Sequence, residues 1–163
     1  MLAIGGWKNA GRGFVDVVKD STPEQRQRRF RFNKHAVEFL RMFDFDGLDI
    51  NWEYPGARGS PKEDKYSFAR WVRELKMEFV KEGMRTGRRP LILAAAVPAT
   101  PYWVDQGYLV SKLCQSLDFV NVMAYDLHGI WAKSKKTGHH AGLYADGGAS
   151  HSAETAVNVW KGR

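Results

Sequence analysis

Apolar and polar residues alternate along the chain with two different periods. Four short apolar segments have the pattern of strands: Met1–Gly6, Gly47–Trp52, Leu91–Val97 and Phe119–Tyr125. Four longer segments have the spacing of amphipathic helices: Pro23–Phe43, Asp64–Lys81, Tyr108–Ser116 and Ser152–Trp160. Strands that alternate with helices predict an α/β fold with parallel strands. Periodicity alone leaves open whether the strands close into a barrel or form an open doubly wound sheet.

One predicted strand carries a column of polar side chains. Asp49, Asn51 and Glu53 alternate with the apolar residues Leu48, Ile50 and Trp52. Successive side chains of a strand point to opposite sides, so the three polar groups project together, ~6.6 Å apart along the strand. A Tyr-Pro-Gly sequence then ends the strand, and parallel α/β proteins build their sites at that carboxyl end. The column therefore indicates a catalytic or binding site, with solvated or turn-capping carboxylates as the alternative.

Residues 46–55, Asp-Gly-Leu-Asp-Ile-Asn-Trp-Glu-Tyr-Pro, resemble the signature of the family 18 glycoside hydrolases, the chitinases and chitinase-like lectins. The family pattern is Asp-Gly-x-Asp-x-Asp-x-Glu, from which this chain departs at Asn51. Residues 2–7 resemble the third-strand motif that ends in Gly-Gly-Trp, and residues 94–98 resemble the fifth strand. Residues 117–126 resemble the sixth-strand motif that ends in Met-x-Tyr-Asp. The likeness points to the animal chitinase branch.

The resemblance implies a partial (β/α)8 TIM barrel over residues 1–163, covering roughly strands 3 to 6 with their helices. Strands 1, 2, 7 and 8 of such a barrel have no counterpart in the sequence. A whole barrel usually needs ~250 residues, whereas this chain has 163. We therefore expect part of a catalytic domain that is monomeric when the barrel is complete.

The resemblance also implies a substrate-assisted, retaining hydrolysis of chitin or N-acetylglucosamine oligosaccharides. Glu53 would act as general acid and then base, and Tyr125 would hydrogen-bond the acetamido carbonyl. Asn51 occupies the position of an acid that stabilises developing positive charge, so activity is expected to be weakened. Asp49 would accept a hydrogen bond from the Asn51 amide. The alternative is a catalytically inactive lectin that binds chitin oligosaccharides, which Asn51 favours and Glu53 disfavours.

Further residues are expected to bind substrate because they match the same motifs or resemble aromatic positions along the sugar cleft. They are Trp7, Tyr54, Asn121, Met123, Asp126 and Trp131. Aromatic faces suit pyranose rings, whose axial C–H groups lie flat on them. The remaining tryptophans are expected to serve packing.

Charge and composition limit the classes of partner that are expected. The formal net charge is +7 and the pI is about 9.6, but the densest basic cluster, residues 26–34, has no nucleic-acid recognition motif and is expected to be a solvated helix face. The histidines lack metal-ligand spacing and no dinucleotide or phosphate loop is present, so neither metal nor cofactor is expected.

The sequence has no apolar run of ~18 residues, the length that a membrane span needs. Extracellular location is implied by the resemblance alone. Cys114, the single cysteine, is expected to be a buried thiol.

Overall fold

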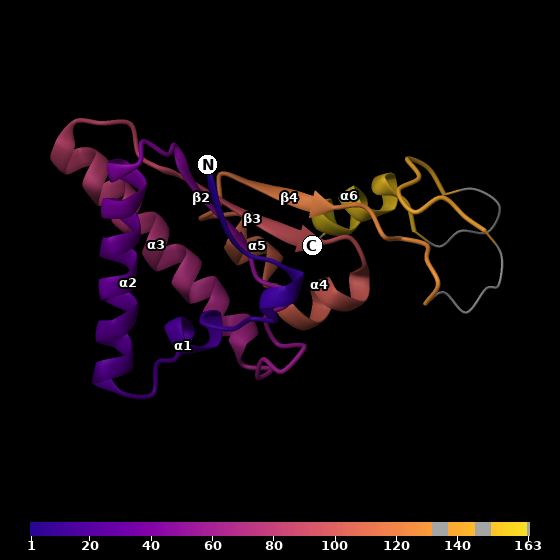
Figure 1. The fold of residues 1–163 in the computed structure, drawn as a ribbon, viewed down its shortest axis with the longest axis horizontal. Helices are drawn as coiled ribbons and strands as arrows, with labels where there is room; N and C mark the ends of the chain where they lie inside the picture. Colours follow the sequence, from indigo (N-terminus) through magenta and orange to yellow (C-terminus); the bar gives the residue numbers. More distant parts are fainter. Residues whose placement is uncertain (132–136, 146–150, 163) are drawn as a thin grey trace.

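A computed structural model describes residues 1–131, 137–145 and 151–162. Its four parallel strands form one sheet in the order β1-β2-β3-β4 (Figure 1). They span Leu2–Gly5 (β1), Gly47–Asn51 (β2), Ile92–Pro98 (β3) and Phe119–Met123 (β4). The predicted strands are therefore confirmed, with ends that differ from those expected by one or two residues. The sheet is open, with β1 and β4 at its edges.

The two faces of the sheet differ in polarity. Leu48 and Ile50 of β2 are 2% and 0% exposed and belong to the apolar core. Asp49 lies between them in sequence, so its side chain points to the opposite face. The register pairs Asp49 with Ala3 on β1 and with Ala94 on β3, which places small residues on both sides of it. The polar column therefore lies on the face away from the core.

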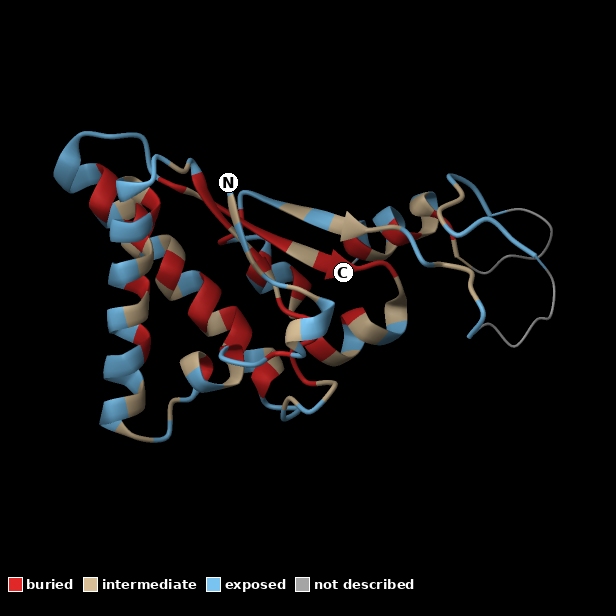
Figure 2. Ribbon diagram, in the orientation of Figure 1, coloured by how far each residue is buried: buried red, intermediate tan, exposed pale blue. Residues whose placement is uncertain are grey.

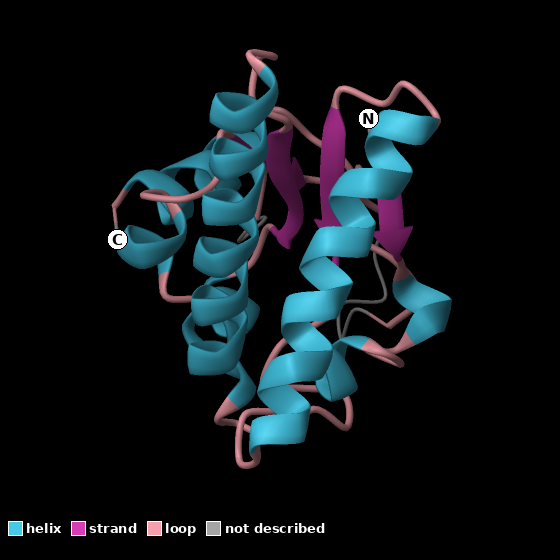
Figure 3. Cartoon of the chain, turned by 90° about the vertical axis from the view of Figure 1, so that its left-hand side faces the viewer, coloured by secondary structure: helices cyan, strands magenta, loops and turns pink. Residues whose placement is uncertain are grey.

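Two long helices lie side by side on the same side of the sheet, α2 over Pro23–Met42 and α3 over Asp64–Thr86 (Figures 1 and 3). α2 begins with a capping box, in which Thr22 Oγ1 accepts from the Gln25 N–H and the Gln25 side chain accepts from the Thr22 N–H. Proline occupies its first turn, where a missing N–H costs nothing. Buried residues follow one side of α3, which faces the interior (Figure 2).

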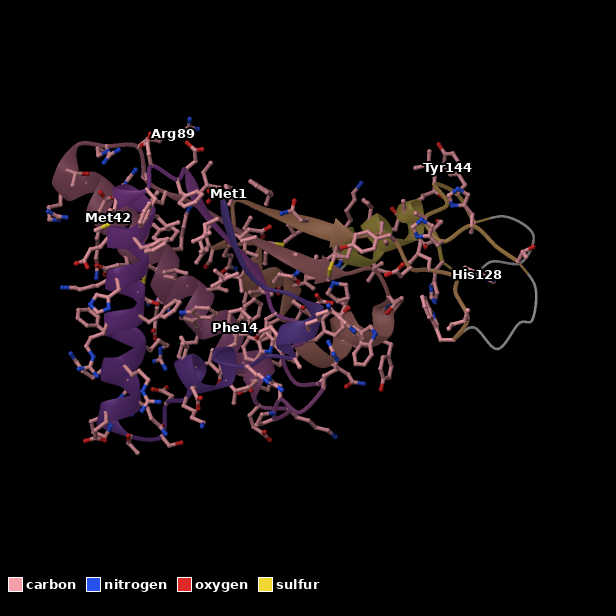
Figure 4. All side chains as sticks on the ribbon, in the orientation of Figure 1. Met1, Phe14, Met42, Arg89, His128 and Tyr144 are labelled. Atoms are coloured by element: carbon pink, nitrogen blue, oxygen red, sulfur yellow. The ribbon has the colours of Figure 1, made fainter. Side chains whose placement is uncertain are left out.

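An aromatic cluster joins β2 to this helix layer. Trp52, directly after β2, is 1% exposed. Its ring stacks on that of Phe14 and packs edge-on against that of Phe68, with 5.4 and 5.7 Å between ring centroids. Phe14 lies in the middle of the molecule in Figure 4. Burying an aromatic side chain contributes about 1.5–3 kcal/mol, so the cluster holds the end of β2 firmly against the helices.

Short helices complete the described part of the fold: η1 (Trp7–Asn9), α1 (Phe14–Val18), α4 (Pro101–Gly107), α5 (Val110–Leu113) and α6 (Ala153–Lys161). The helix predicted over Tyr108–Ser116 was wrong in extent, because Tyr108 is extended and ends α4 while α5 starts only at Val110. Cys114, predicted to be buried, is exposed. Among the described helices, none combines the length and apolar character that a membrane span requires.

Candidate active site

The polar column begins on β2 and continues just past its end. Asp49 and Asn51 lie on β2 and project from the face of the sheet opposite the apolar core. Glu53 follows the strand and is 7% exposed. The neighbouring strand holds the main chain here, because the Gly6 N–H donates to the Asn51 carbonyl oxygen at 2.9 Å. Gly5 has φ +108°, and any Cβ there would overlap that carbonyl. Glycine at this position therefore allows β1 to approach the carboxyl end of β2.

Glu53 is the most enclosed acid of the column. Burial raises the pKa of its carboxyl above the ordinary value, in spite of hydrogen bonding from Tyr54 and Asn51 and the positive charge of Arg58. A buried carboxyl with a raised pKa keeps its proton to higher pH, which is the property that a general acid needs.

Asp49 lies earlier along β2 and takes its hydrogen bond from another strand. Its Oδ2 accepts from Nδ2 of Asn121 on β4 at 3.1 Å. Burial raises the pKa of Asp49, and the Asn121 bond lowers it in part. The expected bond from the Asn51 amide to Asp49 was wrong: among the described residues, Asp49 accepts from Asn121 instead. Asp49 Oδ1 and Asn51 Oδ1 are buried and have no hydrogen-bond partner in the described part of the chain.

Tyr125 and Asp126 follow β4, at the same end of the sheet as Glu53. Tyr125 is 51% exposed, and burial of part of its ring together with the charges of Glu53 and Asp126 raises its pKa. Asp126 has φ +52°, and its N–H donates to Nδ1 of His140 at 3.4 Å. Met123, the last residue of β4, is partly buried. The fold thus brings the Met-x-Tyr-Asp end of β4 toward Glu53.

The three aromatic residues expected to contact sugar differ in exposure. Trp7 and Trp131 are 58% and 65% exposed. Tyr54 is 9% exposed, and its ring stacks on Trp103 at 5.1 Å. Its pKa is raised by burial and by the adjacent Glu53. Tyr54 therefore lies beside Glu53 with its ring packed on Trp103, and it offers little aromatic surface to a sugar.

Two residues of the site have no recognisable signal in the sequence. Arg58 Nη1 donates to the carbonyl oxygens of Trp7 and Glu53, at 3.2 and 3.1 Å. The buried Tyr108 hydroxyl donates to the carbonyl oxygen of Trp52 at 3.2 Å. Both hold the main chain on either side of the catalytic candidates, through contacts between residues far apart in sequence.

Two other regions lie outside this arrangement. An apolar cavity of about 470 Å³ lies between β1 and helices α1 and α2, bordered by Leu2, Phe14 and Phe39, on the core side of the sheet. His128 and Tyr144 lie on loops at the opposite end of the molecule from α2 (Figure 4). Within residues 1–131, 137–145 and 151–162, no group of three or more His, Cys, Asp or Glu side chains could hold a metal ion.

Known proteins resemble this chain in sequence and in overall structure. The chain is 44% identical over 165 residues to chitotriosidase-1 of the mouse, Mus musculus, an alignment that covers 98% of this chain and 34% of the mouse protein. Its structure matches an immunomodulatory active chitinase from Trichuris suis, TsES1, with a TM-score of 0.84 at 32% identity. It also matches human YKL-39, described as a pseudo-chitinase with retained chitooligosaccharide binding properties, with a TM-score of 0.85 at 34% identity.

These structural alignments identify the barrel architecture to which the sheet belongs. Each structural match covers 99% of this chain, but 42% of the Trichuris suis chain and 43% of the human chain. The chain thus spans about a third of chitotriosidase-1 and less than half of either solved structure. Its open, parallel sheet is part of a TIM barrel. The family model for glycosyl hydrolases family 18 matches residues 1–163, and the chain belongs to that family.

Proposed function

We propose that the protein is a chitinase-type glycoside hydrolase that cleaves β-1,4 linkages between N-acetylglucosamine units in chitin or chitooligosaccharides. The observation that carries this proposal is the buried Glu53 carboxyl at the end of β2, whose pKa is raised by burial. The likeness to chitotriosidase-1 and to an active chitinase supports the substrate class. We further propose that residues 1–163 form part of a catalytic barrel and that the strands corresponding to 1, 2, 7 and 8 complete it.

In the proposed reaction, Glu53 gives its proton to the bridging oxygen as the bond from that oxygen to the sugar C1 breaks. The acetamido carbonyl oxygen of the same sugar bonds to C1, which forms an oxazolinium ion and retains the configuration after the second step. Glu53, now a carboxylate, takes a proton from a water molecule. The water oxygen bonds to C1 and the oxazolinium ring opens, which restores the acetamido group.

Neighbouring residues orient this chemistry. The Tyr125 hydroxyl would donate to the acetamido oxygen, and its position after β4 near Glu53 supports that role. Asn51 would contact the acetamido N–H through its oxygen, which has no other partner among the described residues. Asn51 carries no charge, however, and a lost electrostatic stabiliser of ~2.7–4 kcal/mol slows a reaction by ~10²–10³. We therefore propose a weakened enzyme.

The remaining cleft residues would bind the sugar chain. Exposed Trp7 and Trp131 offer ring surface to a sugar. Asn121 and Met123 project from one side of β4, and Asp126 lies in the loop that follows the strand. We propose that the protein acts extracellularly, as a monomer when its barrel is complete, and without a cofactor or a nucleic-acid or membrane partner.

A second candidate function is a lectin that binds chitooligosaccharides without cleaving them. The neutral Asn51 favours it, as does the likeness to YKL-39, a pseudo-chitinase that retains chitooligosaccharide binding. The retained Glu53 argues against it.

Release of a chromogenic group from N-acetylglucosamine oligomers distinguishes the two functions. The complete barrel is compared with its Asn51→Asp and Glu53→Gln variants. A weakened enzyme gives slow release that Asn51→Asp accelerates about 10²-fold or more and Glu53→Gln abolishes. A lectin binds oligomers tightly in all three forms and releases no chromogen in any.

A further inference from the structure

Arg58 joins two segments of the candidate site that lie far apart in the sequence. It has φ +51° in the loop after β2, a left-handed conformation that arginine seldom adopts. From there its Nη1 donates to the main-chain oxygens of Trp7 and Glu53, at 3.2 and 3.1 Å. One guanidinium thus connects the segment that carries the exposed indole with the peptide group of the candidate acid.

The same guanidinium covers one face of the Trp7 indole. Its Cζ lies 3.4 Å from the ring centroid, a stacking distance, and the cation is attracted to the ring's electron density. The indole is nevertheless 58% exposed. Because one face is occupied by Arg58, the surface that remains open to a sugar lies on the other face and the rim. The plane of the indole is therefore set by a group that also binds the Glu53 main chain.

We infer that Arg58 is a positioning residue that fixes the open face of Trp7 relative to Glu53, so that a sugar stacked on the indole is held in register with the candidate acid. This inference rests on the proposed function. Arg58 touches the side chain of Trp7 and two carbonyl oxygens; it does not itself act on the bond that breaks. Its effect should depend on whether the oligomer is long enough to reach Trp7.

Arginine has properties here that lysine lacks. A planar guanidinium lies flat on an aromatic face while its N–H groups donate within its own plane, whereas an ammonium is a compact, strongly hydrated charge. Arg58→Lys should therefore keep the charge near Glu53 and lose the stacked geometry. This variant separates orientation of the indole from electrostatics at the acid.

The experiment measures kcat and KM of the complete barrel on a short substrate, a chromogenic disaccharide, and on a hexasaccharide. The variants are Arg58→Gln, Arg58→Lys, Trp7→Ala and the double variant Arg58→Gln/Trp7→Ala, with Arg31→Gln on the exposed side of α2 as a matched loss of charge. Melting temperatures show that each variant is folded.

We expect Arg58→Gln and Arg58→Lys to raise KM for the hexasaccharide about three- to tenfold, the size of a cation–aromatic contact, and to change KM for the disaccharide by a smaller factor. The effect should disappear in the Trp7→Ala background, and Arg31→Gln should behave as the parent. Equal losses on both substrates, an undiminished effect without the indole, or tighter hexasaccharide binding after loss of Arg58 would each overturn the inference.

Failure of the proposed function remains distinguishable from failure of this inference. The dissociation constants of the hexasaccharide and the disaccharide are measured for the same variants by calorimetry in a Glu53→Gln background. Absence of turnover in every variant would reject hydrolysis. A hexasaccharide affinity that depends on Arg58 only when Trp7 is present would still support the positioning role, and an affinity independent of Arg58 would reject it.

Discussion

Asn121 on β4 donates a hydrogen bond to Asp49 on β2, across the strand that separates them, with 3.1 Å between Nδ2 and Oδ2. The register explains how the contact spans β3. Ala94 is paired with Asp49, and Ala96 is paired with Asn121. Methyl groups at these two positions leave space above β3, so a longer side chain from β4 reaches the acid on β2.

We predict that Asn121→Leu raises the pKa of Asp49. Leucine has a similar size but no donor, so the burial that raises this pKa remains while the bond that lowers it is lost. Ala96→Val should act in the same direction by placing a branched side chain between the two strands. Titration of the Asp49 carboxyl by ¹³C NMR measures the change. An unchanged Asp49 pKa in both variants would show that the bond has no electrostatic effect.

A second prediction concerns the pH dependence of activity. Asn51→Asp places a carboxylate beside Glu53, and a neighbouring negative charge raises the pKa of an acid whose pKa burial has already raised. Because the protonated form of Glu53 is the active acid, the alkaline limb of kcat against pH should move to higher pH in the variant. Profiles recorded on the complete barrel test this, and coincident alkaline limbs would contradict it.

Close packing between β1 and β2 predicts an unequal response to two alanine substitutions. Gly5 and Gly59 both have positive φ, +108° and +92°, but a Cβ at Gly5 would overlap the Asn51 carbonyl, whereas no atom lies within 4 Å at Gly59. Gly59→Ala should cost about 1–2 kcal/mol for the backbone conformation. Gly5→Ala should cost about 1–3 kcal/mol more, because of overpacking. Denaturant unfolding measures both, and equal losses would contradict the steric argument.

An ion pair between α2 and α3 predicts acid sensitivity. Arg41 Nη2 lies 2.6 Å from Glu82 Oε2, with side chains 18% and 7% exposed, and the hydrogen bonds that Arg41 donates lower the pKa of Glu82. The stabilisation is complete above the unfolded pKa of ~4.3 and is lost as pH falls through the lower, folded pKa.

Glu82→Gln should therefore lower the free energy of unfolding at pH 7 by about 1.5–3 kcal/mol, with a smaller difference from the parent at low pH. Glu38→Gln, at an exposed position of α2, is the matched control. Denaturant unfolding at several pH values measures the difference. A loss that stays constant down to strongly acidic pH would show that the charge of Glu82 does not contribute.

Local patterns predicted the sheet and its polar column well. The strict alternation around Ile50 gives one face to the core and the other to Asp49 and Asn51, because side chains of a strand must alternate. The same reasoning misplaced the helix near Tyr108. There Tyr108 is extended and lies between two short helices. Its buried hydroxyl donates to the carbonyl oxygen of Trp52, directly after β2, and no local pattern encodes that contact.

Long-range contacts explain what the sequence missed in the candidate site. Arg58 follows the strand as one cation among many, and its place beside Trp7 depends on how β1 lies against β2. The partner of Asp49 was also missed, because Asn121 reaches it only where β3 supplies alanines. Residue types mark candidate chemistry, but pairs 50 or more positions apart are set by tertiary packing.

Position 51 is held through its peptide oxygen by the Gly6 N–H, and this anchor is independent of the side chain. Amide and acid have nearly the same volume, and their codons differ by a single nucleotide. Evolution can therefore exchange them without rebuilding the scaffold. In the proposed enzyme, a single nucleotide change at this position would be enough to lower or raise turnover.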